Sequence, residues 1–142
     1  SLIDSSIKPP IIWRPEDREL NDRFDAIGIR IAHYMSTFTG LFPGEVEDAY
    51  LMHYQETGDG FGLHHDDSRD FGIRIGVSID KSAEFSAVNY VEPAPIAGVT
   101  EVPIRLLRGD CVIQDAAKAL DHAVQTLEPA RNFAVWEIVP NS

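Results

Sequence analysis

The sequence predicts a mainly β protein: a β-sandwich or barrel of short strands with one long helix packed on a sheet. Two observations carry this prediction. Residues 15–39 repeat apolar side chains at helical spacing, whereas residues 49–139 consist of short apolar or alternating runs separated by turn signals. The 142 residues are enough for one domain with its own core. We therefore expect a single domain, with an irregular arm at 1–14, a helix at 15–39 and a β core at 49–139.

Composition narrows the class of protein. Hydrophobic residues make up 44% of the chain and charged residues 25%, which is ordinary for a soluble globular protein. The net charge of −11 argues against a nucleic-acid partner, because phosphate binding needs clustered lysine and arginine. The single cysteine, Cys111, cannot form an intrachain disulfide. There is no apolar run long enough for a membrane span, and no signal peptide pattern. We expect a soluble, cytoplasmic protein.

The predicted helix has a clear beginning, face and end. Pro15 suits the first helical position, and acidic residues follow it in the first turn. Gly28 is unfavourable inside a helix but does not break it. Gly40, Pro43 and Gly44 are expected to end it. Apolar residues at spacings of three and four predict one buried face: Leu20, Phe24, Ile27, Ile31, Met35 and Phe38.

The strands follow from alternation and from turn residues. In 71–80, the apolar residues Ile73, Ile75, Val77 and Ile79 alternate with smaller or polar residues, which indicates a strand with one apolar face. A short strand is also possible at 11–13, and 92–98 is expected to be a loop because of its prolines. The predicted strands cover 49–55, 61–65, 71–80, 84–91, 102–107, 111–114, 122–127 and 132–139.

A glycine-rich stretch near the middle of the chain ends in two histidines and two aspartates, residues 64–67. Residues two apart in a strand share a face, so His64 pairs with Asp66 and His65 with Asp67. A histidine and a carboxylate on one face are two ligands of a metal site, and iron(II) oxygenases add a second histidine. The isolated pair is more often accidental. The candidates for the further histidine are His33, His53 and His122.

Arg131 is the other residue that bears on function. Its neighbours in 131–136 are mostly apolar, which favours a guanidinium turned into the protein. An inward arginine needs an anionic partner, and a carboxylate suits its planar fork. The alternative is a surface arginine paired with Glu128.

Taken together, these motifs resemble the iron(II)- and 2-oxoglutarate-dependent oxygenases, in particular the prolyl-hydroxylase-like branch. The resemblance covers roughly residues 50–139, and the helix before them suits the support helix of that family. It implies a double-stranded β-helix, the jelly-roll or cupin-like barrel. The residues that carry it, in order, are Tyr54, Gly58, Phe61, His64, Asp66, Gly109, Asp110, His122, Arg131 and Trp136.

The resemblance also implies roles for individual residues. His64, Asp66 and His122 would bind Fe(II). Arg131 would pair with the distal carboxylate of the cosubstrate 2-oxoglutarate, assisted by the hydroxyl of Tyr54. O₂ would be the second cosubstrate, with ascorbate as an optional reductant.

The same register leaves His65 and Asp67 as neighbours of the iron ligands rather than ligands. It turns Phe61 and Leu63 away from His64, toward the supporting helix.

The implied reaction couples the oxidative decarboxylation of 2-oxoglutarate to the hydroxylation of a C–H bond. A prolyl residue is the default substrate, and other peptides, proteins or small molecules stay open. Residues 83–87 replace a Gly-Gly-Glu-Thr-like segment of many family members, which affects the substrate more than the cofactor. Retention of Asp66 disfavours a halogenase. The expected substrate contacts lie in 1–14, 67–70 and 92–100, with Arg69 and Arg74 as contacts for an anionic substrate.

Two other functions fit parts of the pattern. One is a cupin-like metal oxygenase that does not use 2-oxoglutarate, which would have no need of Arg131. The other is a non-catalytic barrel that binds a ligand or a protein, which would have no need of the histidines.

Overall fold

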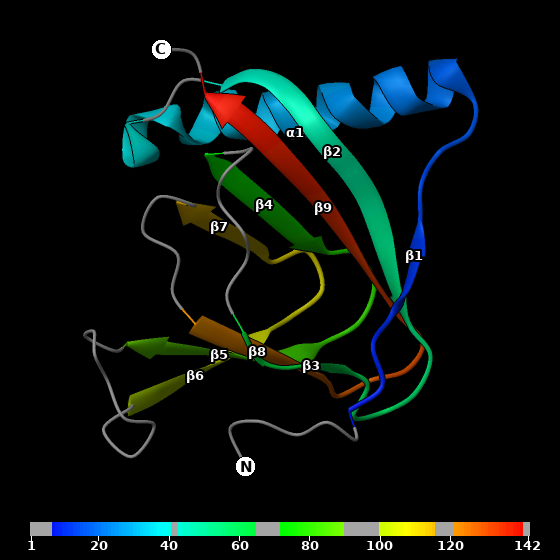
Figure 1. Cartoon of the computed structure of the whole chain (residues 1–142), viewed down its shortest axis with the longest axis vertical. Coiled ribbons are helices and arrows are strands. Elements are labelled where there is room, and N and C mark those ends of the chain that lie inside the picture. Colours follow the sequence, from blue (N-terminus) through cyan, green and yellow to red (C-terminus); the bar gives the residue numbers. More distant parts are fainter. Residues whose placement is uncertain (1–6, 41–42, 65–71, 90–99, 116–120, 141–142) are drawn as a thin grey trace.

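The computed structural model describes residues 7–40, 43–64, 72–89, 100–115 and 121–140 (Figure 1). Within these ranges the side chains of residues 39, 63, 84–89, 100–102, 115 and 121 are not described. One helix, α1 (Arg18–Thr39), accompanies two antiparallel sheets. The first sheet has the order β1 (Ile11–Trp13), β2 (Pro43–Tyr54), β9 (Arg131–Pro140), β4 (Ile73–Ser78), β7 (Cys111–Asp115). The second has the order β3 (Gly60–His64), β8 (Asp121–Thr126), β5 (Ala83–Asn89), β6 (Thr100–Leu106).

The prediction of a mainly β protein with one N-terminal helix is confirmed, and each predicted strand is present. The ends described differ from the predicted ones by at most two residues, except that β2 begins at Pro43, six residues before the predicted start. Strands β2 to β9 divide into two four-stranded layers, with β1 added at one edge. From β3 onward, each strand lies in the other layer from the strand before it, except β6, which pairs with β5; this is the arrangement of a double-sheet jelly roll. Among the described residues no strand pairing joins the two sheets. The expected barrel is therefore a two-layered sandwich in this part of the chain, not a closed cylinder.

The N-terminal end of α1 differs from the prediction, whereas its C-terminal end at Thr39 matches it. The helix begins at Arg18, not at Pro15, because Asp17 is its N-cap: the Asp17 carboxylate accepts a hydrogen bond from the Leu20 amide at 3.0 Å. Gly40 ends the helix in the left-handed conformation (φ 70°), which glycine adopts readily. Pro43 does not belong to the terminating turn; it is the first residue of β2. In the described part of the chain, no helix is long and apolar enough to cross a membrane.

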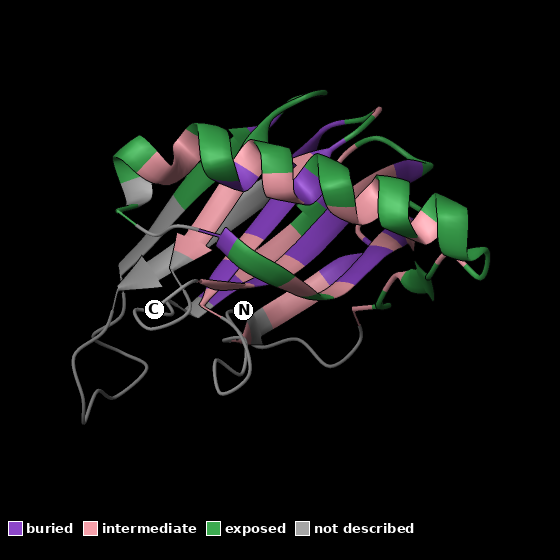
Figure 2. Cartoon of the chain, turned by 90° about the horizontal axis from the view of Figure 1, so that it is seen from above, coloured by how far each residue is buried: buried purple, intermediate pink, exposed green. Residues whose placement is uncertain are grey.

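The buried face of α1 is only partly the predicted one. Leu20, Ile27 and Phe38 are 47%, 50% and 76% exposed, and the helix instead contacts the sheet through a stripe that includes the buried residues Gly28 and Ala32. Figure 2 shows that α1 alternates between exposed and buried or partly buried residues as it crosses the sheet. The stripe comprises Phe24, Gly28, Ile31 and Ala32.

Packing against the sheet requires glycine at position 28, although glycine is unfavourable inside a helix. A Cβ at this position would lie 2.4 Å from the ring of Trp136 on β9, so only glycine permits the approach. The Trp136 indole N–H donates to the carbonyl oxygen of Phe24 at 2.8 Å. The tryptophan therefore holds the helix at one fixed distance from the sheet.

The five-stranded sheet has two different faces because side chains alternate along its strands. One face packs against α1 and forms a core with Ala49, Ile73, Ile75, Ala134, Trp136 and Ile138. The opposite face looks toward the four-stranded sheet. It carries Tyr50, Met52, Tyr54, Arg74, Arg131, Phe133 and Glu137, all of which line one cavity.

Candidate active site between the two sheets

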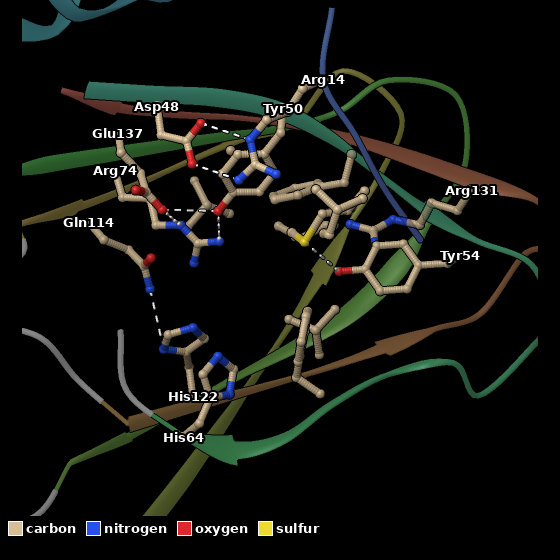
Figure 3. A pocket seen from close by; sticks show the side chains of 18 residues that line it. Arg14, Asp48, Tyr50, Tyr54, His64, Arg74, Gln114, His122, Arg131 and Glu137 are labelled. Carbon is tan, nitrogen blue, oxygen red and sulfur yellow. Dashed lines mark hydrogen bonds and ion pairs between the residues drawn. The ribbon is translucent and has the colours of Figure 1, made fainter. Parts of the chain in front are cut away.

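A cavity of about 360 Å³ lies between the sheets (Figure 3). Its walls are partly apolar, with Met52, Phe61, Val124 and Phe133 among them. Figure 3 shows three polar groups around it: a pair of histidines, an arginine beside a tyrosine, and a larger charged cluster. A concave, partly apolar site with a few converging polar groups is typical of small-molecule binding.

The two histidines come from paired strands of the four-stranded sheet. His64 on β3 is directly opposite His122 on β8, and the centroids of their rings are 4.3 Å apart. Of the three candidate partners, the fold thus brings His122 to His64. His33 is exposed on α1, and the Nδ1 of His53 lies 2.8 Å from the side-chain oxygen of Asn132.

Both imidazoles are held through Nδ1. The Nδ1 of His64 lies 2.8 Å from the carbonyl oxygen of Gly62, and that of His122 lies 3.4 Å from the side-chain nitrogen of Gln114. A carbonyl can only accept, so His64 carries its proton on Nδ1 and presents a basic Nε2. A hydrogen bond of this kind is common in metal-ligating histidines.

The carboxylate that the sequence assigns to this site cannot be placed. Asp66, with His65 and Asp67, lies outside the described residues. Among the residues that are described, no group of three metal-ligating side chains occurs. The chemistry of the two imidazoles, together with an aspartate two positions after His64, nevertheless fits an iron(II) centre.

Phe61 lies on the side of β3 that the sequence did not predict. Its ring centroid is 5.2 Å from that of His64, and both side chains line the cavity. The reason is an irregularity in the pairing of β3 with β8 between Phe61 and His64, which changes the side on which the following residues point. The prediction that Phe61 faces the helix is therefore wrong, and Leu63 lies outside the described side chains.

Arg131 is fully buried, and its surroundings leave little freedom to the guanidinium. Its Cζ lies 4.8 Å from the ring centroid of Tyr54 and 4.7 Å from that of Phe133, and its Nε donates to the Ser78 hydroxyl at 3.3 Å. Within the described part of the chain, neither terminal nitrogen has a hydrogen-bond partner. Burial lowers the pKa of Arg131, with Tyr54 and Asp80 opposing the shift.

The surface alternative for Arg131 does not hold. Glu128 is exposed and accepts a hydrogen bond from the Ser82 amide at 3.0 Å. A buried cation without a partner is costly, and a carboxylate ligand would satisfy both terminal nitrogens at once.

Tyr54 and Gly76 shape the environment of this arginine. Tyr54 is fully buried, and its hydroxyl lies 3.8 Å from the sulfur of Met52. Burial raises the pKa of Tyr54, against the influence of Arg131, so the hydroxyl stays a neutral donor. A Cβ at Gly76 would lie 2.2 Å from the ring of Phe133. Glycine is therefore what gives the Phe133 ring its place beside the guanidinium.

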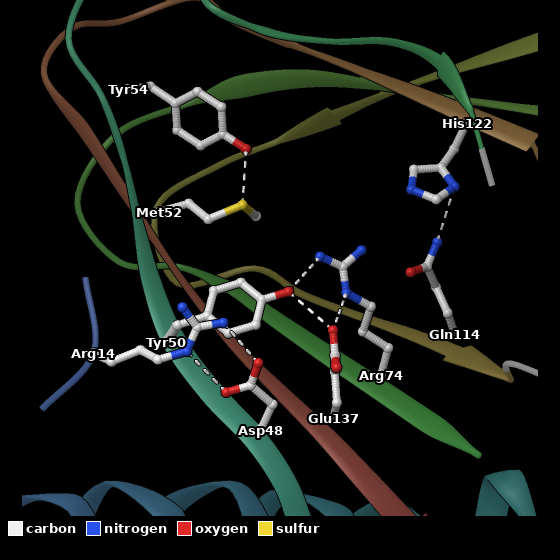
Figure 4. Close-up of polar contacts among 9 residues, drawn as sticks. All are labelled: Arg14, Asp48, Tyr50, Met52, Tyr54, Arg74, Gln114, His122 and Glu137. Atoms are coloured by element: carbon white, nitrogen blue, oxygen red, sulfur yellow. Dashed lines mark hydrogen bonds and ion pairs between the residues drawn. The ribbon is translucent and has the colours of Figure 1, made fainter. Parts of the chain in front are cut away.

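The charged cluster contains residues that sequence reasoning missed, except for Arg74. Arg74 donates to the Tyr50 hydroxyl at 3.2 Å, and this hydroxyl donates to the Glu137 carboxylate at 3.0 Å (Figure 4). Arg14 forms two hydrogen bonds with Asp48, at 3.0 and 2.7 Å, and stacks 5.0 Å over the ring of Tyr50. Burial is the main reason that the pKa of Tyr50 rises to about 12.

Strand register explains the cluster. In the five-stranded sheet, Gln114 is opposite Arg74, Arg74 is opposite Glu137, and Glu137 is opposite Asp48. These residues form one polar row across four strands on the cavity face. The only sequence signal was alternation on each strand, such as the six-residue spacing between Arg131 and Glu137. Arg69, the other predicted contact for an anion, lies outside the described residues.

Comparison with known proteins identifies the fold. No family model and no curated protein sequence matches the chain. The solved structure of OsALKBH1 matches with a TM-score of 0.59 and 16% identity, over 87% of this chain and 65% of that one. A Pseudomonas putida prolyl-4-hydroxylase matches with a TM-score of 0.56 and 10% identity, over 92% of this chain and 71% of that one. The chain thus spans about two thirds of the length of these proteins and shares their fold.

Proposed function

We propose that this protein is an iron(II)- and 2-oxoglutarate-dependent dioxygenase. It would couple the oxidative decarboxylation of 2-oxoglutarate to the hydroxylation of a C–H bond. The observation that carries the proposal is Arg131: a buried guanidinium, without a hydrogen-bond partner for its terminal nitrogens among the described residues, in the same cavity as the His64–His122 pair. A prolyl-4-hydroxylase, from the branch that the sequence motifs resemble, is among the solved structures that share this fold.

His64 and His122, with Asp66, would hold the metal. Bound iron(II) supplies the activation of O₂, which the side chains cannot perform. The protein positions the two imidazoles: the Gly62 carbonyl fixes the tautomer of His64, and strand pairing sets the distance between the two rings.

Arg131 would bind the distal carboxylate of 2-oxoglutarate. The rings of Tyr54 and Phe133 lie beside its guanidinium, and Ser78 holds Nε, so the two terminal nitrogens are the donors left for a ligand. This favours a planar carboxylate that accepts two parallel hydrogen bonds. The Tyr54 hydroxyl is a further donor for the same carboxylate.

The apolar wall has its own part in this function. Met52, Phe61, Val124 and Phe133 line the same cavity as the arginine and the histidines. They exclude water from the space that the cosubstrate would fill, and a less polar environment strengthens the pairing of Arg131 with a carboxylate.

The substrate would approach from the charged cluster. A prolyl residue is the default by resemblance, either in a peptide or a protein, and small molecules are the other class. Arg14, Asp48, Arg74 and Glu137 line this part of the cavity, so polar groups of a substrate would find hydrogen-bonding and charged side chains there. Succinate release measured over a panel of proline-containing peptides, free amino acids and small carboxylic acids would identify the class.

An anaerobic titration tests the proposal. Iron(II) is added to the protein without oxygen, and then 2-oxoglutarate, while the visible spectrum is recorded. We expect a charge-transfer absorption band that requires both components and that disappears in His122→Ala. Iron binding with no response to 2-oxoglutarate would indicate a cupin-like metal oxygenase. Absence of iron binding would indicate a non-catalytic barrel and end the proposal.

A further inference from the structure

Gln114 connects the two sheets at the candidate metal site. It lies on β7 of the five-stranded sheet, at one end of the polar row, and its side chain reaches His122 on β8 of the opposite sheet (Figure 4). The side-chain nitrogen of Gln114 lies 3.4 Å from the Nδ1 of His122. This distance is long for a hydrogen bond. The proposed function assigns no role to Gln114.

The two histidines are held by groups of different kinds. The partner of His64 Nδ1 is the carbonyl of Gly62, which can only accept a hydrogen bond. The partner of His122 Nδ1 is a primary amide, which donates through its NH₂ group and accepts through its oxygen. The Gly62 carbonyl therefore favours one tautomer of His64, whereas the Gln114 amide can pair with either tautomer of His122, through a different end in each case.

Metal binding through Nε2 requires one of these two orientations. With the amide nitrogen toward His122, as in Figure 4, Nδ1 is the acceptor and the proton of a neutral imidazole sits on Nε2. A metal at Nε2 would displace that proton to Nδ1. The amide NH₂ and the Nδ1–H would then face each other as two donors, which is unfavourable.

We infer that Gln114 is a positioning residue for the metal site: it turns its side-chain oxygen to His122 Nδ1–H and thereby keeps Nε2 available for the metal. The inference rests on the proposed metal site but assigns to Gln114 a role that neither the motif nor the fold contains. Metal binding at His122 and the orientation of the Gln114 amide are then coupled: each one favours the other. If Gln114 only connected the two sheets, metal affinity would not depend on which end of its amide faces the His122 ring.

The test compares two variants at Gln114 and one control variant. Gln114→Glu offers only acceptors, Gln114→Leu offers neither donor nor acceptor, and Gln125→Leu alters an exposed glutamine on the same strand as His122. The first measurement is the dissociation constant for Co(II), without 2-oxoglutarate. We expect Gln114→Leu to bind Co(II) about 10- to 100-fold more weakly than the unchanged protein. Gln114→Glu should bind at least as tightly, and Gln125→Leu should not differ.

The second measurement is the tautomer of His122, from ¹⁵N NMR shifts at about pH 8.5, above the ordinary histidine pKa. We expect the metal-free unchanged protein to carry the proton on Nε2. Both the Zn(II)-loaded protein and metal-free Gln114→Glu should carry it on Nδ1. This measurement does not require the leucine variant to fold.

The outcomes separate the inference from the proposed function. Co(II) binding by the unchanged protein, with equal affinity in Gln114→Leu, overturns the inference and leaves the metal site in place. A proton that stays on Nε2 in Gln114→Glu also overturns it. If the unchanged protein binds neither Co(II) nor Zn(II), the metal site itself is wrong and the inference ends with it.

Discussion

Two arginines enter the same cavity from neighbouring strands, and their surroundings are opposite in kind. Arg131 on β9 lies between two aromatic rings and has one hydroxyl contact, with its terminal nitrogens unpaired among the described residues. Arg74 on β4 belongs to a network with Tyr50 and Glu137. The first arrangement needs a ligand to be satisfied, and the second is largely satisfied by the protein.

The two arginines therefore have different roles in one cavity: Arg131 is available to bind a ligand, and Arg74 stabilises the protein. Aromatic rings stabilise a guanidinium by their π faces without using its N–H groups, so they keep Arg131 charged and available. The network around Arg74 uses N–H groups of that guanidinium and connects three strands, β2, β4 and β9. Substitution of the two arginines should consequently affect different measurements.

The largest effect is expected for Arg131→Leu. Loss of a charge-assisted pair with a carboxylate costs about 2–4 kcal/mol, which corresponds to a dissociation constant for 2-oxoglutarate raised about 30- to 900-fold. The free energy of unfolding should not fall, because the substitution removes a buried charge that the described residues leave unpaired. Calorimetric titration of the iron-loaded protein measures the first quantity, and urea unfolding the second. Arg105→Leu, at an exposed position, is the control. Unchanged 2-oxoglutarate affinity would remove Arg131 from the proposed function.

The reverse pattern is expected for Arg74→Leu. Its removal leaves the carboxylate of Glu137 mostly buried beside Tyr50, and we expect the free energy of unfolding to fall by about 2–3 kcal/mol. The double variant Arg74→Leu, Glu137→Leu should recover part of that loss, because both charges are then gone. Urea unfolding of the three proteins measures this. If Arg74→Leu is as stable as the unchanged protein but weakens 2-oxoglutarate binding, the two arginines have been assigned to the wrong roles.

The sequence predicts local features of this fold better than features that depend on distant contacts. Apolar periodicity predicts the strands and the helix because burial of one face is a local property of each segment. It predicts neither the stripe through Gly28 nor the position of Phe61. The first depends on contact with Trp136, 108 positions further along the chain, and the second on an irregularity in strand pairing.

Strand register limits the prediction of the site in the same way. The row that joins Gln114, Arg74, Glu137 and Asp48 exists only because four strands are aligned at those residues. A shift of one strand by a single residue would turn its member of the row to the opposite face. Arg131 and His122 were suggested by a motif whose spacing already encodes such an alignment, whereas the polar row follows no motif.

Gly76→Ala tests how the Arg131 side of the comparison is built, with an intermediate effect. The new Cβ would overlap the Phe133 ring, which must move from its place beside the guanidinium. We expect a loss of about 1–3 kcal/mol in the free energy of unfolding from overpacking, together with weaker binding of 2-oxoglutarate. Phe133→Leu, combined with Gly76→Ala, should restore stability, because the smaller side chain accommodates the methyl group. If it restores 2-oxoglutarate affinity as well, the ring of Phe133 has no part in orienting Arg131.

The smallest effect concerns Asp80, which acts on Arg131 without contacting it. Its carboxylate accepts two hydrogen bonds from Asn132, both at 2.9 Å, and its charge favours the charged form of Arg131. Burial raises the pKa of Asp80, but the hydrogen bonds from Asn132 outweigh it, and the pKa is lowered overall. A lowered pKa means that Asp80 stabilises the fold above the ordinary aspartate pKa and that this contribution is lost as the pH falls through its own pKa. Because Asp80 is partly exposed and its charge is screened by solvent, we expect Asp80→Asn to lower the free energy of unfolding by less than about 1 kcal/mol at neutral pH, and by nothing measurable in acid. Urea unfolding of the two proteins across this pH range gives the difference directly. A difference that stays constant into acid would mean that the hydrogen bonds to Asn132, and not the charge of Asp80, support the strand that carries Arg131.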